Sequence, residues 1–227
     1  MSSFLPWHRE LCNRLEALLR EVDPRVSLHY WDFTTDPRAS DNGTGGTTNL
    51  FTDDFMGNDD GDVSAPFESL RGPIIRRKVR QGPPSPNDIK SDEEIISNGD
   101  MESKENQWKG FREYLEVTPH NYIHPYIGGS IGFGDTAFED PFVFLLHSNI
   151  DRLWAKWQLV PGKEWRLDPE QVYGVEENDE EILKNMWPWD GSNPPIGPWT
   201  PPENMKEVKN CKDPSIVKPP PYDTNPS

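Results

Sequence analysis

Histidines provide the clearest chemistry in this sequence. The chain has five of them. His120 and His124 are four residues apart, which places both imidazoles on one face of a helix. His147 lies on the next expected helix, and ligands on facing helices are a common way to hold a metal ion in a helical protein. Neutral imidazole suits copper, zinc, iron and nickel. A chance pair of histidines on a solvated helix is the alternative, and both interpretations stay open at this point.

Other catalytic patterns do not compete with the histidines. The sequence has no Gly-rich phosphate loop that follows a strand, and no Cys beside a plausible His. Residues 43–46 read Gly-Thr-Gly-Gly, but no strand leads into them, so a flexible loop is expected there. The many carboxylates are expected on the solvated surface, and nothing selects a glycosidase pair among them.

Four segments show the apolar spacing of helices and must position the histidines. The last is the best defined, because Asp140 suits an N-cap and Pro141 suits the first helical position. Pro119 is expected to separate the second segment from the third. The expected helices cover residues 7–22, residues 106–117, the stretch after Pro119 up to Gly128-Gly129, and residues 141–158.

Long irregular stretches separate these helices. Residues 34–66 are rich in Thr, Asp, Gly and Asn, and we expect them to form loops. Residues 80–106 are polar, although the apolar pair Ile95-Ile96 suggests a short helix. A short acidic helix is expected near residues 177–186, within a Pro- and Trp-rich end of the chain. The sequence therefore predicts a mainly α fold with long irregular loops.

The domain organisation expected from this pattern has two parts. Residues 1–160 should form the core, in which residues 35–105 are mostly a loop insertion. Residues 161–227 should form an extension that packs on the core. A length of 227 residues fits one domain of ordinary size with such an extension.

Composition excludes several classes of protein. The formal net charge is −16, from 39 acidic and 23 basic residues, and nucleic-acid binding needs a basic surface. No apolar run is long enough to span a membrane, and the first residues do not resemble a signal peptide, so we expect a cytoplasmic protein. Cys12 and Cys211 do not form a disulfide framework, and free thiols are favoured over a single bridge.

Four segments resemble the tyrosinase and catechol oxidase family of type-3 copper proteins. The combination of the four is specific, and it spans about residues 4–158. The segments read Phe-Leu-Pro-Trp-His-Arg at residues 4–9, Leu-His-Tyr-Trp-Asp-Phe at 28–33, Glu-x-x-Pro-His-Asn-x-x-His at 116–124, and Asp-Pro-x-x-Phe-x-x-His-x-x-x-Asp-Arg-x-Trp at 140–154.

The resemblance implies a set of copper ligands. By position, His120, His124 and His147 are similar to the three ligands of the family's copper B site. His8 matches the third ligand of copper A. The first two copper A ligands lie upstream of this segment in the family and have no counterpart here. His29 takes the place of a Pro, so we expect it to be a core residue rather than a ligand.

The fold implied by the resemblance is a four-helix bundle without its N-terminal helix. We expect that the missing helix leaves an apolar groove, lined by some of Leu11, Leu15, Phe144 and Trp154. An exposed groove of that kind favours association. A homo-oligomer or a partner chain that covers the missing helix is therefore expected.

The activity implied by the resemblance is copper-dependent oxidation of phenols and catechols to o-quinones with O2. Glu116 and Asn121 match positions that hold a water near the coppers, which is proposed to deprotonate a monophenol. The alternative for Glu116 is a surface ion pair with Arg112. Asp151 is expected to form a structural ion pair with Arg9 or Arg152. Two other functions stay open: a metal-binding or inactive protein with only copper B complete, and, more remotely, a zinc hydrolase.

Overall fold

The computed structural model describes most of the chain and divides it into two compact units. The described residues are 3–67, 73–85, 87–99, 101, 110–173, 186, 189, 208 and 210–222. The first unit comprises Met1–His29, Ile96–Glu113 and Ile150–Thr224. The second unit comprises Tyr30–Ile95, Tyr114–Asn149 and Asn225–Ser227. The predicted boundary at residue 160 stays a prediction.

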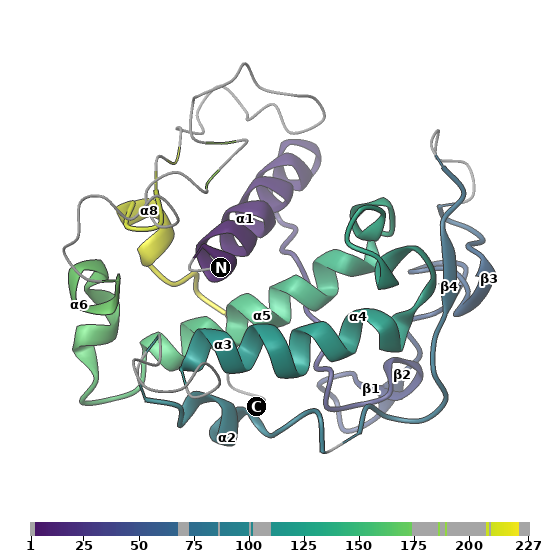
Figure 1. Ribbon diagram of the computed structural model, residues 1–227. Coiled ribbons are helices and arrows are strands. Elements are labelled where there is room, and N and C mark those ends of the chain that lie inside the picture. Colours follow the sequence, from purple (N-terminus) through teal and green to yellow (C-terminus); the bar gives the residue numbers. More distant parts are fainter. Residues whose placement is uncertain are drawn as a thin grey trace. The chain divides into compact units, whose positions relative to one another are not determined.

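Helices dominate the described residues, as Figure 1 shows, and the predicted mainly α class is confirmed. The helices are α1 (Phe4–Val22), α2 (Asp92–Ile96), α3 (Phe111–Leu115), α4 (Asn121–Ile127), α5 (Phe142–Gln158), α6 (Pro169–Tyr173) and α8 (Pro214–Val217). A π-helical turn covers Glu116–His120, and short 3₁₀ turns cover Pro37–Ala39, Gly129–Gly132, Ala137–Glu139 and Glu164–Leu167. The strands are β1 (Ser40–Asp41), β2 (Thr47–Thr48), β3 (Asp60–Asp62) and β4 (Arg76–Lys78).

Helix α1 begins three residues earlier than its apolar spacing predicts. It starts at Phe4, so Pro6 lies in the first turn. Pro is tolerated there, because the N–H group that it lacks would have no partner within the helix. Leu5 and Leu11 are each 1% exposed and form part of the core of the first unit. The helix ends where expected, with the backbone N–H of Asp23 donating to Leu19 O at 3.0 Å.

The helical run from Phe111 to Ile127 corrects the expectation of a break at Pro119. Helix α3 continues through the π turn into α4 without interruption. The N–H of Asn121 donates to Glu116 O, which is a spacing of five residues. The wider π turn accommodates a residue without an N–H group, and π turns occur frequently at functional sites. Residues 106–109, with which the second expected helix began, lie outside the described residues.

Helix α5 confirms the best-defined prediction of the sequence. It covers Phe142–Gln158, and Asp140 caps it, with the N–H of Phe142 donating to Asp140 Oδ1 at 2.9 Å. Its residues are buried on all sides, which is typical of a helix that runs through the interior of a protein. The division between the two units falls within this helix, between Asn149 and Ile150.

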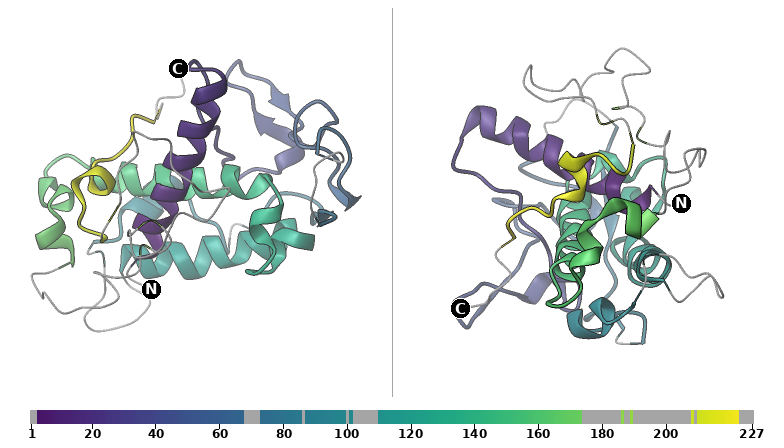
Figure 2. Two further views of the ribbon diagram at one scale, coloured as in Figure 1. Left: turned by 90° about the horizontal axis from the view of Figure 1, so that it is seen from above. Right: turned by 90° about the vertical axis from the view of Figure 1, so that its left-hand side faces the viewer.

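The second unit contains two small hairpins within a region predicted as loop. Strand β1 pairs antiparallel with β2, and β3 pairs antiparallel with β4, so that Gly61 lies opposite Arg77. Figure 2 shows these strands from two further sides. The prediction for residues 34–66 therefore missed three short strands. They were hard to foresee because strands of two or three residues show too little alternation of polar and apolar side chains. The short helix expected around Ile95-Ile96 is present as α2.

The first unit holds the C-terminal segment against α1. Arg9 Nε lies 2.5 Å from Asp151 Oδ1, and both side chains are buried. Arg9 Nη1 also donates to Gln158 Oε1 at 2.9 Å and to Ile216 O at 2.9 Å. The hydroxyl of Tyr222 donates to Asp151 Oδ2 at 2.6 Å. The predicted structural role of Asp151 beside Arg9 is thus confirmed.

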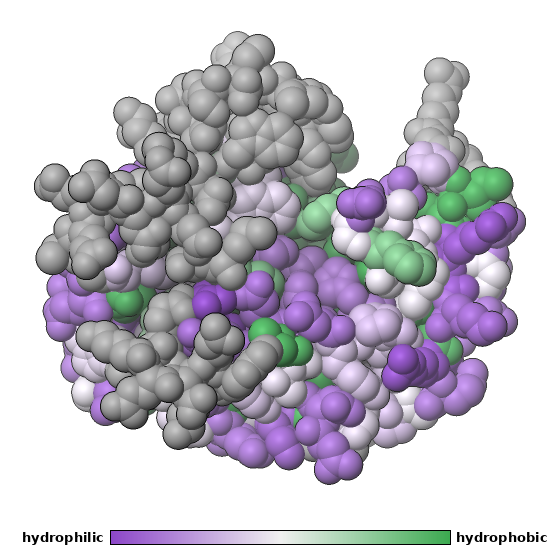
Figure 3. Space-filling view, in the orientation of Figure 1, coloured by the Kyte–Doolittle hydropathy of each residue, from purple (hydrophilic) through white to green (hydrophobic). Residues whose placement is uncertain are grey.

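Burial corrects the expectation of an exposed apolar groove. Leu11 and Trp154 are each 1% exposed and Phe144 is 8% exposed, while Leu15 is half-buried. On the face drawn in Figure 3, hydrophilic residues predominate and apolar ones are scattered. The four residues therefore do not line an open apolar surface, and association stays a prediction.

Three smaller findings complete the fold. Cys12 and Cys211 are both buried, and no disulfide joins them, as expected. In the part of the chain that the structure describes, no helix combines the length and the apolar character needed to cross a membrane. Of the acidic helix expected at residues 177–186, all but Met186 lies outside the described residues.

Candidate metal centre

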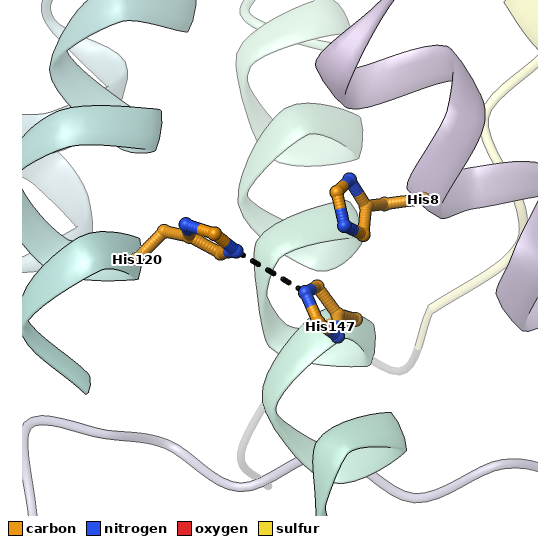
Figure 4. Close-up of side chains that lie close together, drawn as sticks. All are labelled: His8, His120 and His147. Atoms are coloured by element: carbon orange, nitrogen blue, oxygen red, sulfur yellow. Dashed lines mark hydrogen bonds between the residues drawn. The ribbon is translucent and has the colours of Figure 1, made fainter. Parts of the chain in front are cut away.

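Three of the predicted ligands converge within the second unit. His120 is the last residue of the π turn, His124 lies on α4, and His147 lies on α5. The Nε2 atom of His120 is 3.1 Å from Nε2 of His124 and 3.2 Å from Nε2 of His147. Figure 4 shows His120 and His147 extending toward each other from their two helices. The two histidines that are four residues apart and the histidine of the next helix therefore come together, as the sequence predicts.

The opposite nitrogen of each ring faces an oxygen acceptor. The Nδ1–H of His120 donates to Asn121 Oδ1 at 2.9 Å. The Nδ1–H of His124 donates to the carbonyl oxygen of Ile131 at 2.7 Å, and that of His147 to the carbonyl of Val143 at 2.9 Å. An oxygen without a hydrogen requires the proton on Nδ1, so each neutral ring carries its lone pair on Nε2.

With the ring protons on Nδ1, the Nε2 atoms of His124 and His147 both present lone pairs toward Nε2 of His120. This is the arrangement of metal-ligating histidines, in which the second ring nitrogen donates to a carbonyl or carboxylate and holds the ring in place. Two imidazole nitrogens bound to one ion at about 2.0–2.1 Å and at a tetrahedral angle are about 3.3 Å apart. The observed separations of 3.1 Å and 3.2 Å agree with that value. The three side chains therefore fit a metal ion of the type that imidazole binds, copper and zinc included.

Burial favours the neutral form that a metal needs. His147 is 1% exposed, and His120 and His124 are half-buried. Burial lowers the pKa of His124 below its usual 6.5, and the hydrogen bond to the Ile131 carbonyl opposes this shift only in part. At neutral pH the His124 ring is therefore neutral, with its Nε2 lone pair available.

His8 belongs to the first unit. It lies on α1, where Figure 4 also labels it, and its Nδ1–H donates to Phe4 O at 2.7 Å. The ring centroids of Phe4 and Trp7 are 4.7 Å and 5.0 Å from that of His8. Its Nε2 lone pair is thus available in the same way as those of the other three. Its participation in a metal site stays a prediction.

The two predicted catalytic residues lie beside the histidines in sequence. Glu116 is half-buried at the start of the π turn. Asn121 is exposed, and its amide oxygen accepts the Nδ1–H of His120. Asn121 thus orients the His120 ring, a role that the sequence did not suggest. The alternative role of Glu116, an ion pair with Arg112, also stays a prediction. The carboxylate oxygen measured beside Arg112 belongs to the neighbouring Glu113, whose Oε1 lies 3.5 Å from Arg112 Nη2. The catalytic roles of Glu116 and Asn121 stay predictions.

His29 corrects one expectation. It was expected in the core and is instead exposed, on an extended segment that follows α1. Nothing in the local sequence distinguishes the two outcomes, because an apolar-aromatic segment of this kind can cross a core or lie along a surface. The sequence also missed Phe138, whose ring lies over that of His147 with centroids 5.9 Å apart.

The helical fold and the converging imidazoles describe a helical protein with a histidine site that could bind a metal ion. The model of the common central domain of tyrosinase matches residues 1–160. A tyrosinase of Streptomyces antibioticus is 31% identical over 217 residues, which cover 85% of this chain and 74% of that protein. A tyrosinase of Streptomyces lincolnensis is 32% identical over 214 residues, with the same coverage of both chains. The chain therefore belongs to the tyrosinase family of type-3 copper proteins, and it is an oxidoreductase of the tyrosinase type.

Two solved structures show a more distant likeness. A polyphenol oxidase of Thermothelomyces thermophila has a TM-score of 0.45 at 19% identity, with 83% of this chain and 60% of that chain covered. A polyphenol oxidase of Vitis vinifera has a TM-score of 0.44 at 21% identity, with 81% and 56% covered. The chain thus spans less than two thirds of either structure.

Proposed function

We propose that this protein is a copper-dependent oxidase that converts phenols and catechols to o-quinones with O2. The single observation that supports it most is the convergence of three Nε2 lone pairs, 3.1 Å and 3.2 Å apart, in a chain of the tyrosinase family. The curated relatives described above carry the name tyrosinase. Copper, when bound, supplies the redox chemistry between the phenolic substrate and O2.

The protein's own part is to hold and orient the ligands. His120, His124 and His147 would bind copper through Nε2, while the acceptors of their Nδ1 protons prevent the rings from turning. His8 would serve a second copper, a role that rests on its position in the resemblance. For the 227-residue chain as a monomer we expect one tightly bound copper, because His8 alone makes a weak site.

Glu116 and Asn121 would manage the proton of a monophenol. A phenol with a pKa near 10 is a poor ligand at neutral pH, so its hydroxylation needs a base close to the metal. Glu116 precedes His120 by one turn, and Asn121 follows it directly. A water held between the Glu116 carboxylate and the Asn121 amide could accept that proton.

The test loads the full chain with copper and measures two quantities, the copper content per chain and the formation of o-quinone from a catechol. Copper binding together with o-quinone formation supports the proposal. Binding without quinone formation favours the alternative, a metal-binding or inactive member of the family with only one site complete. His147→Ala should lose both, while His29→Ala, at an exposed position, should keep both. Retention of zinc instead of copper after aerobic purification would favour a hydrolase.

Assembly is a separate proposal. A homo-oligomer or a partner chain that brings further imidazoles to His8 would complete a second copper site. Sedimentation of the copper-loaded protein, together with its copper content, tests this idea. Two coppers per chain in a dimer would support it, whereas one copper per chain in a monomer would contradict it.

A further inference from the structure

One aromatic side chain outside the ligand set lies against the metal centre. The ring of Phe138 lies over that of His147 at a centroid distance of 5.9 Å and an interplanar angle of 24°. Phe138 is 37% exposed, whereas His147 is 1% exposed. Phe138 therefore covers the His147 ring on one side and presents apolar surface to solvent on the other.

The segment that carries Phe138 is held in place at several points. It runs from Gly128 to Asp140, between α4 and α5. The carbonyl of Ile131 accepts the Nδ1–H of His124 at 2.7 Å. Thr136 Oγ1 donates to the carbonyl of Ser130 at 2.7 Å. These bonds tie the loop both to a ligand and to itself, so Phe138 occupies a defined place beside the imidazoles.

The close approach at Gly129 holds the start of the loop. Gly129 has a φ of +60°, and a Cβ there would lie 2.0 Å from the carbonyl oxygen of Arg76. At the other end, Asp140 is held by Arg77 through two hydrogen bonds of 2.6 Å and 2.7 Å. The backbone of the loop is therefore fixed against the β4 segment at both ends.

The loop is also acidic. Residues 125–146 include three carboxylates and no Lys, Arg or His. The charge of Asp140 is balanced by Arg77, with which it forms a buried ion pair. Asp135 is exposed and Glu139 is half-buried, and both lie within three residues of Phe138. Asp135 and Glu139 are therefore the sequence neighbours of Phe138 that carry charge within the loop, while the basic strand β4 contacts the start of the loop at Gly129 and Ser130.

We propose, on the basis of the proposed function, that this loop selects the substrate. Phe138 packs against the substrate's aromatic ring, and Asp135 and Glu139 favour phenols with a cationic amine over phenols with a carboxylate.

The physical basis has two independent parts. Aromatic rings attract one another in offset or edge-to-face arrangements beyond the gain from burying their area. Because the Phe138 ring stacks on that of His147, a phenol bound beside this imidazole would have its ring near Phe138. Charges within about 10 Å of one another still interact at physiological salt, where screening acts over about 8 Å. An ammonium group on the substrate is therefore attracted by the two carboxylates, and a carboxylate group is repelled.

The test uses the full chain loaded with zinc, which binds imidazole but does not oxidise phenols. The ligands are tyramine, 3-(4-hydroxyphenyl)propionate and 4-ethylphenol, which share a phenol ring and differ in charge. Isothermal titration calorimetry gives their dissociation constants. We expect tyramine to bind about fivefold more tightly than the propionate, which equals about 1 kcal/mol.

Two sets of variants separate the two parts of the proposal. Phe138→Ala should weaken the binding of all three phenols about fivefold, and Phe138→Leu should weaken it less, because leucine keeps apolar surface. The double variant Asp135→Asn, Glu139→Gln should bring the affinities for tyramine and the propionate within about twofold, with 4-ethylphenol unchanged. Phe55→Ala is the matched control, because Phe55 is also 37% exposed and lies outside this loop. It should change none of the affinities.

The outcomes distinguish this inference from the function on which it rests. If zinc does not bind, or if no phenol binds the zinc-loaded protein, the inference is overturned. If the copper-loaded protein forms o-quinone while Phe138→Ala binds all three phenols as the unmodified chain does, the inference alone is overturned. An unchanged preference in the double variant overturns the selection by charge.

Discussion

The guanidinium of Arg77 and the carboxylate of Asp140 form a doubly hydrogen-bonded ion pair that is completely buried. The distances are 2.7 Å from Nε to Oδ2 and 2.6 Å from Nη2 to Oδ1, and both side chains are 0% exposed. Asp140 Oδ1 also accepts the N–H of Phe142, which begins α5. One carboxylate thus fixes β4 to the start of the helix that carries His147.

Removing the charge of Asp140 should destabilise the protein strongly. Asp140→Asn leaves the Arg77 guanidinium buried without a counter-charge, and breaking a buried pair in this way typically costs about 3–5 kcal/mol. Chemical denaturation measures the free energy of unfolding. The matched control is Asp62→Asn, because Asp62 pairs with the neighbouring Arg76 at 2.8 Å while both side chains are more than 60% exposed. That change should cost less than about 1 kcal/mol, and equal losses in the two variants would contradict the prediction.

Each of the three converging histidines should be necessary for metal binding. His120→Ala, His124→Ala and His147→Ala each leave two nitrogens where the site needs three, so we expect metal affinity to fall by more than about 100-fold, beyond the typical loss for an outer partner of a ligand. Metal analysis after dialysis and competition with a chromophoric chelator measure this. His29→Ala should retain the metal, and a histidine variant that also retained it would exclude that residue from the site.

Asn121 should matter for metal affinity as well as for proton transfer. Asn121→Ala removes the acceptor of the His120 Nδ1–H, which lies 2.9 Å away. Loss of such a partner typically lowers metal affinity by about 10–100-fold. The chelator competition described for the histidines measures the change. An affinity within about twofold of the unmodified chain would show that the amide does not orient the ligand.

Glu116 should distinguish monophenols from catechols. We expect Glu116→Gln to lower hydroxylation of a monophenol by at least about tenfold, because general-base assistance is typically worth 10²–10⁴-fold. Catechol oxidation should fall by less than about threefold, since a catechol is more acidic and needs a base less. Steady-state rates of the copper-loaded protein on a matched monophenol and catechol measure both, in a preparation in which the second copper site is complete. Equal losses on the two substrates would make Glu116 a structural residue.

Glu10 should make stability depend on pH. Burial raises the pKa of Glu10 to about 7, although Arg14 Nε lies 2.5 Å from Glu10 Oε1 and opposes the shift. The unfolded chain loses this proton near pH 4.5. Between these values the folded state binds a proton that the unfolded state does not. The stability from this group is therefore full below about pH 4.5 and is lost as the pH rises to about 7, with a slope of up to about 1.4 kcal/mol per unit.

Glu10→Gln tests this dependence because it keeps the shape of the side chain and removes the titration. The free energy of unfolding, measured by chemical denaturation at pH 5, 6 and 7, should vary less in this variant than in the unmodified chain. An identical pH dependence in the two proteins would show that Glu10 keeps its ordinary pKa. Asp213, whose charge also raises the pKa of Glu10, is kept unchanged in both.

Local patterns predicted the features that depend on neighbours in sequence. Asp140 and Pro141 begin α5 because a side-chain cap and a proline at the first helical position act within a few residues. His120 and His124 share a face because residues four apart are neighbours on a helix. The mainly α class and the convergence of the three histidines therefore followed from short segments of the chain.

Tertiary structure decided the features that depend on distant residues or on the exact turn of the backbone. Pro119 does not end the helix, because a π turn accommodates it, and His29 is exposed although its apolar neighbours suggested a core position. The orientation of the His124 ring depends on the Ile131 carbonyl, which a loop beyond the helix brings to its Nδ1. Hydrogen bonds act only over about 3 Å, so sequence spacing could place His120 and His124 on one face but could not predict the contact with Ile131.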